Sequence, residues 1–438
     1  LIAGHSAAIS SGSLSNSGKI AAKGTTSISA VKTLSNAAGG EILSDEALVV
    51  SAEDIRQNGT LSGKKSLAIE SRSLTTAKGS LSTSLGNVSL KTGEASLGGD
   101  VIAHGDLRVQ ANKLTSQRDA QLQSHGPLTL TATDATLYGT QVAQGALTLT
   151  AQNLIHGGVT TAANLTVNSG HFNNLSEGLF LSQGHLDISG NTVLNAGQVM
   201  GNSLSLTSAT FSNDGLWQGT SALHMTADEL RTGSTSRTLT AGSLTLDAGL
   251  LNTAGTLQGQ NVVITARDWT NTGSLLGTDK LDVSLASTLS NDGDILSQGN
   301  ASLAAQNIAN QGSLLSDADL TLTGESLDNR GALQGNNLVI NGASLNNNGD
   351  IIGVNGLVVA LTRAFIQQQD KTLLTGGALR LNAATVNNAG QIQGTDIALI
   401  SDSVDNSGRI QGNNDLAFTG NLTNRAAGIV LSQNTLNL

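Results

Sequence analysis

Cysteine is absent from this sequence of 438 residues, and proline, aromatic residues and charged residues are scarce. Without cysteine the chain can form no disulfide, thiolate metal site or cysteine nucleophile. Its absence also suits a chain that is exported unfolded through a narrow pore. Charged residues make up 12% of the chain, about half the usual share, and the net charge of −10 argues against a nucleic-acid-binding surface. No apolar run approaches the ~20 residues that a membrane-spanning helix needs.

The sequence also lacks common catalytic and metal-binding motifs. It contains no G-x-S-x-G elbow, no Walker loop and no H-E-x-x-H zinc motif. We therefore assign no catalytic residue, no metal ligand and no cofactor. The histidines have no metal-binding spacing and are expected on the surface or in turns: His5, His104, His125, His156, His171, His185 and His224.

Glycine, aliphatic residues and small polar residues dominate what is present. The chain has 52 glycines, and its polar residues are mainly Ser, Thr, Asn and Gln. This composition favours short strands between tight turns. A helical protein would contain more Glu, Lys and Arg.

A repeat of the form Leu-x-Asn-x-Gly-x-Ile-x-Gly, followed by Leu-x-Ile, recurs along almost the whole chain. One copy begins at Leu327 and contains Asn329 and Gly331, and the next begins at Leu345. The average period of about 19 residues indicates a solenoid. Repeats are expected to begin at about 22 positions, among them Leu74, Leu97, Leu114, Leu137 and Leu250.

Apolar and polar residues alternate within each repeat, as they do at Leu338, Val339 and Ile340. Such alternation predicts short, half-buried strands, about three per repeat, separated by glycine and asparagine turns. Stacked coils would pair each strand with its copy in the next coil. The sequence therefore predicts an all-β fold, a right-handed parallel β-helix of about 22 coils with roughly 19 residues per coil. At ~4.8 Å per coil it would form a rod of roughly 105 Å.

The asparagine of the repeat lies two residues after the leucine, so on a strand both side chains point to the same side. One interpretation is an inward ladder of stacked asparagines that hydrogen-bond to one another. The other is that each asparagine adopts a left-handed turn conformation. The structural positions concerned are Asn291, Asn310, Asn329, Asn347, Asn388, Asn406 and Asn424.

The repeat is regular in residues 193–438 and less regular in residues 1–192, and the whole chain is expected to be one β-helix segment. Between residues 55 and 154 the Asn and Gly positions mostly fail. Two long steps there predict loops near Leu85–Glu94 and Gln117–Pro127, which are either recognition loops or ordinary drift of the repeat.

A few exposed and aromatic residues complete the sequence-based expectations. Tyr138 follows an inward leucine and is a weak contact candidate. The basic residues of the first third are either a solvated surface or a receptor patch: Lys64, Lys65, Arg72, Lys78, Lys91, Arg108, Lys113 and Arg118. The large aromatic residues at inward positions are expected in the core: Trp217, Trp269, Phe172, Phe211 and Phe365.

Three segments resemble the haemagglutinin repeat of the filamentous haemagglutinin family: Leu289–Ile295, Leu327–Gly335 and Val404–Gly412. In that family such repeats build the long stalks of two-partner-secreted exoproteins of Gram-negative bacteria, which include adhesins and contact-dependent growth inhibition toxins. The resemblance implies export through an outer-membrane transporter and a place at the outer cell surface. The sequence shows neither the secretion-domain start nor a toxin domain, so we expect a fragment of a longer chain.

These observations favour a stalk that holds a distal receptor-binding or toxin module toward a target cell. The first alternative is an adhesin segment that binds an unidentified host or neighbour-cell receptor through its own side wall. A polysaccharide-degrading β-helix enzyme is a remote alternative, because such enzymes cluster carboxylates on one face. Here Asp214, Asp292 and Asp294 occur singly next to glycine, as Asx turns would explain.

Overall fold

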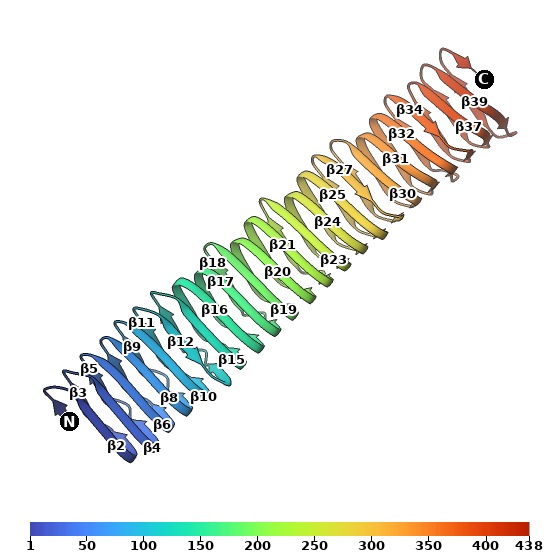
Figure 1. Cartoon of the computed structure of the whole chain (residues 1–438). Helices are drawn as coiled ribbons and strands as arrows, with labels where there is room; N and C mark the ends of the chain where they lie inside the picture. Colours follow the sequence, from blue (N-terminus) through green and yellow to red (C-terminus); the bar gives the residue numbers. More distant parts are fainter. Residues whose placement is uncertain (438) are drawn as a thin grey trace. The chain divides into compact units, whose positions relative to one another are not determined.

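The computed structural model describes residues 1–437, and their regular secondary structure consists of strands β1 (Ile2–Ala3) to β41 (Leu436–Asn437). The strands form a parallel β-solenoid of about 23 turns with about 19 residues per turn, which confirms the predicted fold. The right-handed sense stays a prediction. The chain divides into two compact units, Leu1–Thr220 and Ser221–Leu438. Within each unit, coils follow one another along the chain (Figure 1).

Two kinds of strand build a coil. Short strands of four residues, such as β5 (Glu41–Ser44) and β29 (Ser313–Ser316), follow the asparagine turn. Longer strands run through a corner of the coil. Examples are β8 (Ser66–Thr76), β10 (Asn87–Leu97), β16 (Thr140–His156), β17 (Val159–Asn174), β25 (Ser274–Asn291), β30 (Leu320–Asn329), β31 (Ala332–Asn347) and β32 (Asp350–Gln367).

Each strand pairs in parallel with the equivalent strand of the next coil. Strands β30 and β31 show the register, because Leu327 pairs with Leu345 and Asn329 with Asn347. Identical places of the repeat are therefore stacked on one another. This stacking makes stability approximately a sum over neighbouring coils, so that no coil needs to be stable alone.

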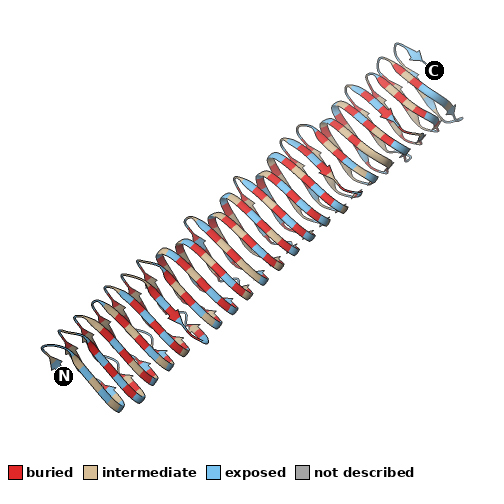
Figure 2. Cartoon of the chain, in the orientation of Figure 1, coloured by how far each residue is buried: buried red, intermediate tan, exposed pale blue. Residues whose placement is uncertain are grey.

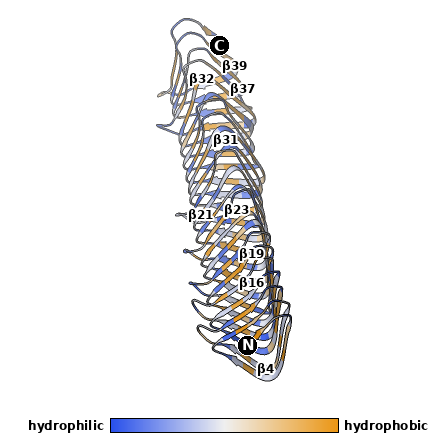
Figure 3. Cartoon of the chain, turned by 90° about the vertical axis from the view of Figure 1, so that its left-hand side faces the viewer, coloured by the Kyte–Doolittle hydropathy of each residue, from blue (hydrophilic) through white to orange (hydrophobic). Residues whose placement is uncertain are grey.

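The core of each unit is a stack of aliphatic side chains from alternate strand positions. Buried positions recur at every second residue of the strands (Figure 2), and hydrophobic segments recur from coil to coil (Figure 3). Leu338 and Ile340 are fully buried, whereas Val339 between them is half-buried. The predicted aromatic core residues are confirmed, since each is at most 1% exposed: Trp217, Trp269, Phe172, Phe211 and Phe365.

Three of the predicted repeat starts are wrong. Leu74 pairs with Ala95 and not with the expected Leu97. Leu114 likewise pairs with Ala135 and not with the expected Leu137. In both coils the leucine occupies the place of the repeat's asparagine. Leu230 pairs with Leu251 rather than Leu250. A small alanine at the first place of the repeat hid the register of the two early coils.

The loop predicted near Leu85–Glu94 is wrong, and the one predicted near Gln117–Pro127 is reduced to a short turn. Strand β10 covers most of the first segment and pairs with β8 without a shift of register. The second segment contains strand β14 (Gln121–Ser124), which pairs with its neighbours. Its extra residues form only a tight turn, closed by a 3.0 Å hydrogen bond from the Ala120 N–H to the Gln117 carbonyl.

Candidate functional site

A ladder of amide side chains runs through the interior at the corner where the repeat's asparagine stands. The Asn291 Nδ2 donates to Asn310 Oδ1 at 2.8 Å, and the same bond joins Asn310 to Asn329 and Asn329 to Asn347. Each Nδ2 also donates to backbone carbonyls, as Asn310 does to Gly312 and Ala332 at 3.2 Å. The ladder therefore satisfies polar groups that burial would otherwise make costly.

The remaining asparagines of the set lie in the same column. Asn388 donates to Asn406 at 2.7 Å, and Asn406 donates to Asn424 at 2.7 Å. Asn388 and Asn406 are at most 2% exposed, while Asn424 is exposed near the last described coil. In the gap between Asn347 and Asn388, Gln367 accepts from Asn347 at 2.8 Å. The geometry of all these residues is that of an internal scaffold.

In the first unit other residues interrupt this column. Leu97 and Leu137 break the chain of amide hydrogen bonds, since they occupy asparagine places and have no polar side chain. In the strand register, Ser116 lies between Leu97 and Leu137 in this column, and His156 lies next to Leu137. The ladder in this unit is therefore a mixed polar network.

His156 is buried, with an exposed fraction of 0%, which corrects the expectation that all histidines lie on the surface or in turns. Its Nδ1 lies 2.8 Å from Asn174 Oδ1 and its Nε2 lies 3.0 Å from Thr160 Oγ1. Its ring packs on Phe180, with ring centroids 4.0 Å apart. Burial lowers the pKa of His156 to about 4, although the hydrogen bond with Asn174 acts in the opposite direction. The other six histidines are exposed, as predicted.

The partners of His156 indicate which ring nitrogens carry hydrogen. Asn174 donates its own Nδ2 to Asn195 at 2.8 Å, so its Oδ1 is the acceptor of an N–H at Nδ1. Thr160 lies 2.8 Å from Gln141 Oε1 and has one hydroxyl hydrogen. Thr160 donates that hydrogen to Gln141 Oε1, so its oxygen can accept from a protonated Nε2, whereas donation to a neutral Nε2 would replace the bond with Gln141. Both protonation states can thus be hydrogen-bonded, but only the neutral state avoids a buried charge.

Tyr138, the contact candidate, is half-buried. The Arg118 guanidinium lies 5.5 Å above its ring and forms an ion pair with Glu177 at 2.5 Å. On the next coil, a Cβ on Gly157 would lie 3.0 Å from the Tyr138 ring. Neighbouring coils therefore cover part of this ring, and its role in binding stays a prediction.

Most basic residues of the first third are paired with acidic residues. Lys64 contacts Asp45 at 2.8 Å, and Lys78 contacts Asp119 at 3.0 Å. Lys65, Arg72, Lys91, Arg108 and Arg118 also have acidic partners. Within residues 1–437 only Lys113 of this set has no ion pair. This pairing favours a solvated surface over a basic receptor patch.

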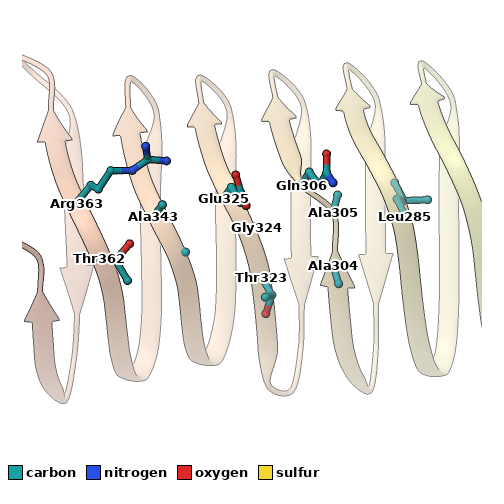
Figure 4. A pocket seen from close by; sticks show the side chains of 11 residues that line it. Leu285, Ala304, Ala305, Gln306, Thr323, Gly324, Glu325, Ala343, Thr362 and Arg363 are labelled. Carbon is teal, nitrogen blue, oxygen red and sulfur yellow. The ribbon is translucent and has the colours of Figure 1, made fainter.

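The second unit contains an open groove with a volume of about 750 Å³. Its floor consists of small residues from three successive coils, Ala305, Gly324 and Gly342. Gln306, Glu325 and Arg363 lie along one edge, and Ala304, Thr323 and Thr362 lie on the other side (Figure 4).

Two bulged coils explain the groove. Between Ala266 and Asp268 the register with β25 shifts by one residue, and between Gly342 and Ser344 the register with β32 does the same. Each extra residue lies at the corner that forms the groove, as expected of a β-bulge. Leu285 and Leu361 occupy the floor position in these two coils. The three coils between them have no extra residue there and are recessed.

In residues 1–437 no three His, Asp or Glu side chains are grouped so that they could hold a metal ion. The same residues contain no helix long and apolar enough to cross a membrane.

Stacked coils with an internal amide column define the class of protein, a structural repeat protein of the β-solenoid type. Comparison with known families supports this assignment. The model of the haemagglutinin repeat matches seven overlapping segments: residues 2–56, 44–101, 102–164, 156–215, 218–268, 239–308 and 300–364. The chain therefore belongs to the haemagglutinin repeat family.

Similar proteins include several nucleases named CdiA. The chain is 42% identical to the 16S rRNA endonuclease CdiA of Enterobacter cloacae subsp. cloacae over 60% of its length and 8% of the relative's. It is 32% identical to the tRNA nuclease CdiA of Escherichia coli O6:K15:H31 over 87% of its length and 14% of the relative's. A third relative is the deoxyribonuclease CdiA of Dickeya dadantii, 36% identical over 52% of this chain and 7% of that protein. The chain thus spans only a small part of these relatives. No solved structure is significantly similar to it.

Proposed function

We propose that this chain is a stalk segment of a large secreted exoprotein of the contact-dependent growth inhibition type, which extends a receptor-binding or toxin module toward a target cell. The observation that carries the proposal is the succession of haemagglutinin repeats, which the family model matches from residue 2 to residue 364. A solenoid can be lengthened coil by coil without changing its interior, because each coil contacts only its neighbours.

The relatives support this function by their names. The names describe nucleases that act on different nucleic acids, yet each of the three proteins is similar to at least 52% of this chain. A region common to toxins with different targets suits a shared spacer better than a catalytic part. We assign the nuclease activity of those proteins to other parts of their chains and none to these residues.

Export and location follow from the same proposal. An outer-membrane transporter of the two-partner-secretion type would export the chain, and the segment would lie on the outer cell surface. The receptor on the target cell is not identified. The absence of cysteine suits passage through such a pore.

Two experiments test the stalk function. Electron microscopy of the isolated chain should show elongated particles, and globular particles would contradict the proposal. In the full-length parent protein, this segment should be replaceable by other haemagglutinin repeats with the same number of coils. Growth inhibition of target cells is then expected to persist. A complete loss, with normal secretion of the chimaera, would show that the segment does more than separate two modules.

A further inference from the structure

We propose that the groove of the second unit binds an extended peptide segment of a partner protein, which carries one basic and one acidic residue about 10 Å apart. This inference goes beyond the stalk function and does not depend on it. It rests on the shape of the groove and on the charges along its edge.

The shape of the groove sets the length of the occupant. Leu285 and Leu361 stand four coil steps apart in the floor position, because three recessed coils lie between them. Four steps of ~4.8 Å give a trough of roughly 19 Å. An extended chain advances ~3.3 Å per residue, so about five or six residues fit between the two leucines.

The floor offers apolar contact without specific shape. Ala305 is 7% exposed and Leu285 is 6% exposed. Their neighbours on the floor are glycines. A shallow floor of this kind suits small side chains such as alanine or valine. It differs from most small-molecule sites, because no lining residue is aromatic and the trough is open along its length.

The edge of the groove supplies the charge selectivity. Glu325 and Arg363 are exposed, and within residues 1–437 neither forms an ion pair. They lie two coils apart, with Ala343 between them in the strand register. Two steps separate these charges by about 10 Å, which matches residues i and i+3 of a peptide in the extended polyproline II conformation, because its three residues per turn place these two side chains on the same side about 9 Å apart. One arginine is too little positive charge for nucleic-acid binding, whereas opposite charges at this spacing complement a peptide with Lys and Asp.

Fluorescence polarisation with three labelled octapeptides tests the proposal. The probes are Gly-Ala-Lys-Val-Ala-Asp-Ala-Gly and two versions in which the charged pair is Lys and Lys or Asp and Asp. The wild-type chain is expected to bind the mixed-charge peptide about tenfold more tightly than either other peptide. Glu325→Lys should shift the preference to the Asp-Asp peptide, and Arg363→Glu should shift it to the Lys-Lys peptide.

A bulky residue in the groove provides an independent test. Ala343→Trp should abolish binding of the mixed-charge peptide, because the half-exposed Ala343 lies between the two charges. The matched control is Ala398→Trp, on a half-exposed strand position outside the groove. It should leave the affinity unchanged, and circular dichroism should show that both variants are folded. Any one of three results would overturn the proposal. The wild-type chain does not bind the mixed-charge peptide, it binds the three peptides with equal affinity, or a folded Ala343→Trp chain binds as the wild type does.

Discussion

Replacing His156 by asparagine tests the internal column of amide side chains at a place where histidine stands instead of the repeat's asparagine. The new asparagine would stand in the register with Asn174 and Asn195, so the amide ladder could continue through it. The change removes a ring that packs on Phe180 with centroids 4.0 Å apart. We therefore expect His156→Asn to be less stable than the wild type at pH 7.5, by about 1–2 kcal/mol.

The pH dependence of this difference can be worked out from the structure. The pKa of His156 falls from 6.5 in the unfolded chain to about 4 in the folded chain. Because the folded pKa is the lower one, the stabilisation is complete above pH 6.5 and is lost as the pH falls toward 4. A difference of about 2.5 pKa units corresponds to about 3 kcal/mol in total, of which about 2 kcal/mol is lost by pH 5. Asparagine does not titrate, so the variant should lack this loss.

Hydrogen exchange of the backbone amides in residues 154–178 gives the free energy of local opening, which is the relevant quantity in a repeat protein. We expect the wild type to be the more stable chain at pH 7.5 and the less stable one at pH 4.5, after correction for intrinsic exchange rates. Both chains contain the same carboxylates, so the effect of their titration cancels when the opening free energies of the two chains are subtracted. His171→Asn is the control, because His171 is exposed on the same coil as Asn174. A constant difference between wild type and His156→Asn from pH 7.5 to 4.5 would refute the reasoning.

Two further substitutions probe the stacking of coils, each with a matched control. A Cβ on Gly331 would lie 1.9 Å from a carbonyl oxygen of the preceding coil, so Gly331→Ala should lower the free energy of unfolding by at least ~2 kcal/mol. Gly18 has the same place in the first copy of the repeat with no atom within 4 Å of such a Cβ, and Gly18→Ala should be tolerated in the same denaturation assay. Asn310→Ala should cost about 2–3 kcal/mol, because Asn329 Oδ1 loses its donor inside the core. Asn300→Ala, on an exposed side chain, should change stability by less than ~0.5 kcal/mol, and an equal effect of both would exclude the ladder as a source of stability.

The repeat could be predicted from the sequence because its side chains alternate between core and solvent. The aliphatic places and the inward aromatic residues follow directly from period-two alternation. Two of the three wrong repeat starts lie where the first place of the repeat holds a small residue. Ala95 and Ala135 gave no signal there, and the nearby Leu97 and Leu137 appeared to begin a repeat.

His156 shows a signal that was available but unused. It lies two residues after Leu154 and two residues before Gly158, which is the spacing of the repeat's asparagine. Counting from the leucine would have placed it inside. The assumption that isolated histidines are exposed outweighed this positional argument.

The groove could not be predicted, because it depends on a difference between neighbouring coils. The single extra residues beside Leu285 and Leu361 can be counted in the sequence. Which corner they enlarge follows only from the strand register, however, and so does the recess between them.

The central claim is that the coils are interchangeable units held in register by their stacked positions. Deletion of residues 292–310 tests it most directly, because it removes one coil of 19 residues and joins Asn291 to the turn that follows Asn310. The account predicts that this variant keeps the β circular dichroism spectrum and the cooperative unfolding of the wild type. Deletion of residues 292–301 removes only part of a coil and should abolish both in the affected coils. If the two deletions had the same effect on circular dichroism and unfolding, the account would be contradicted.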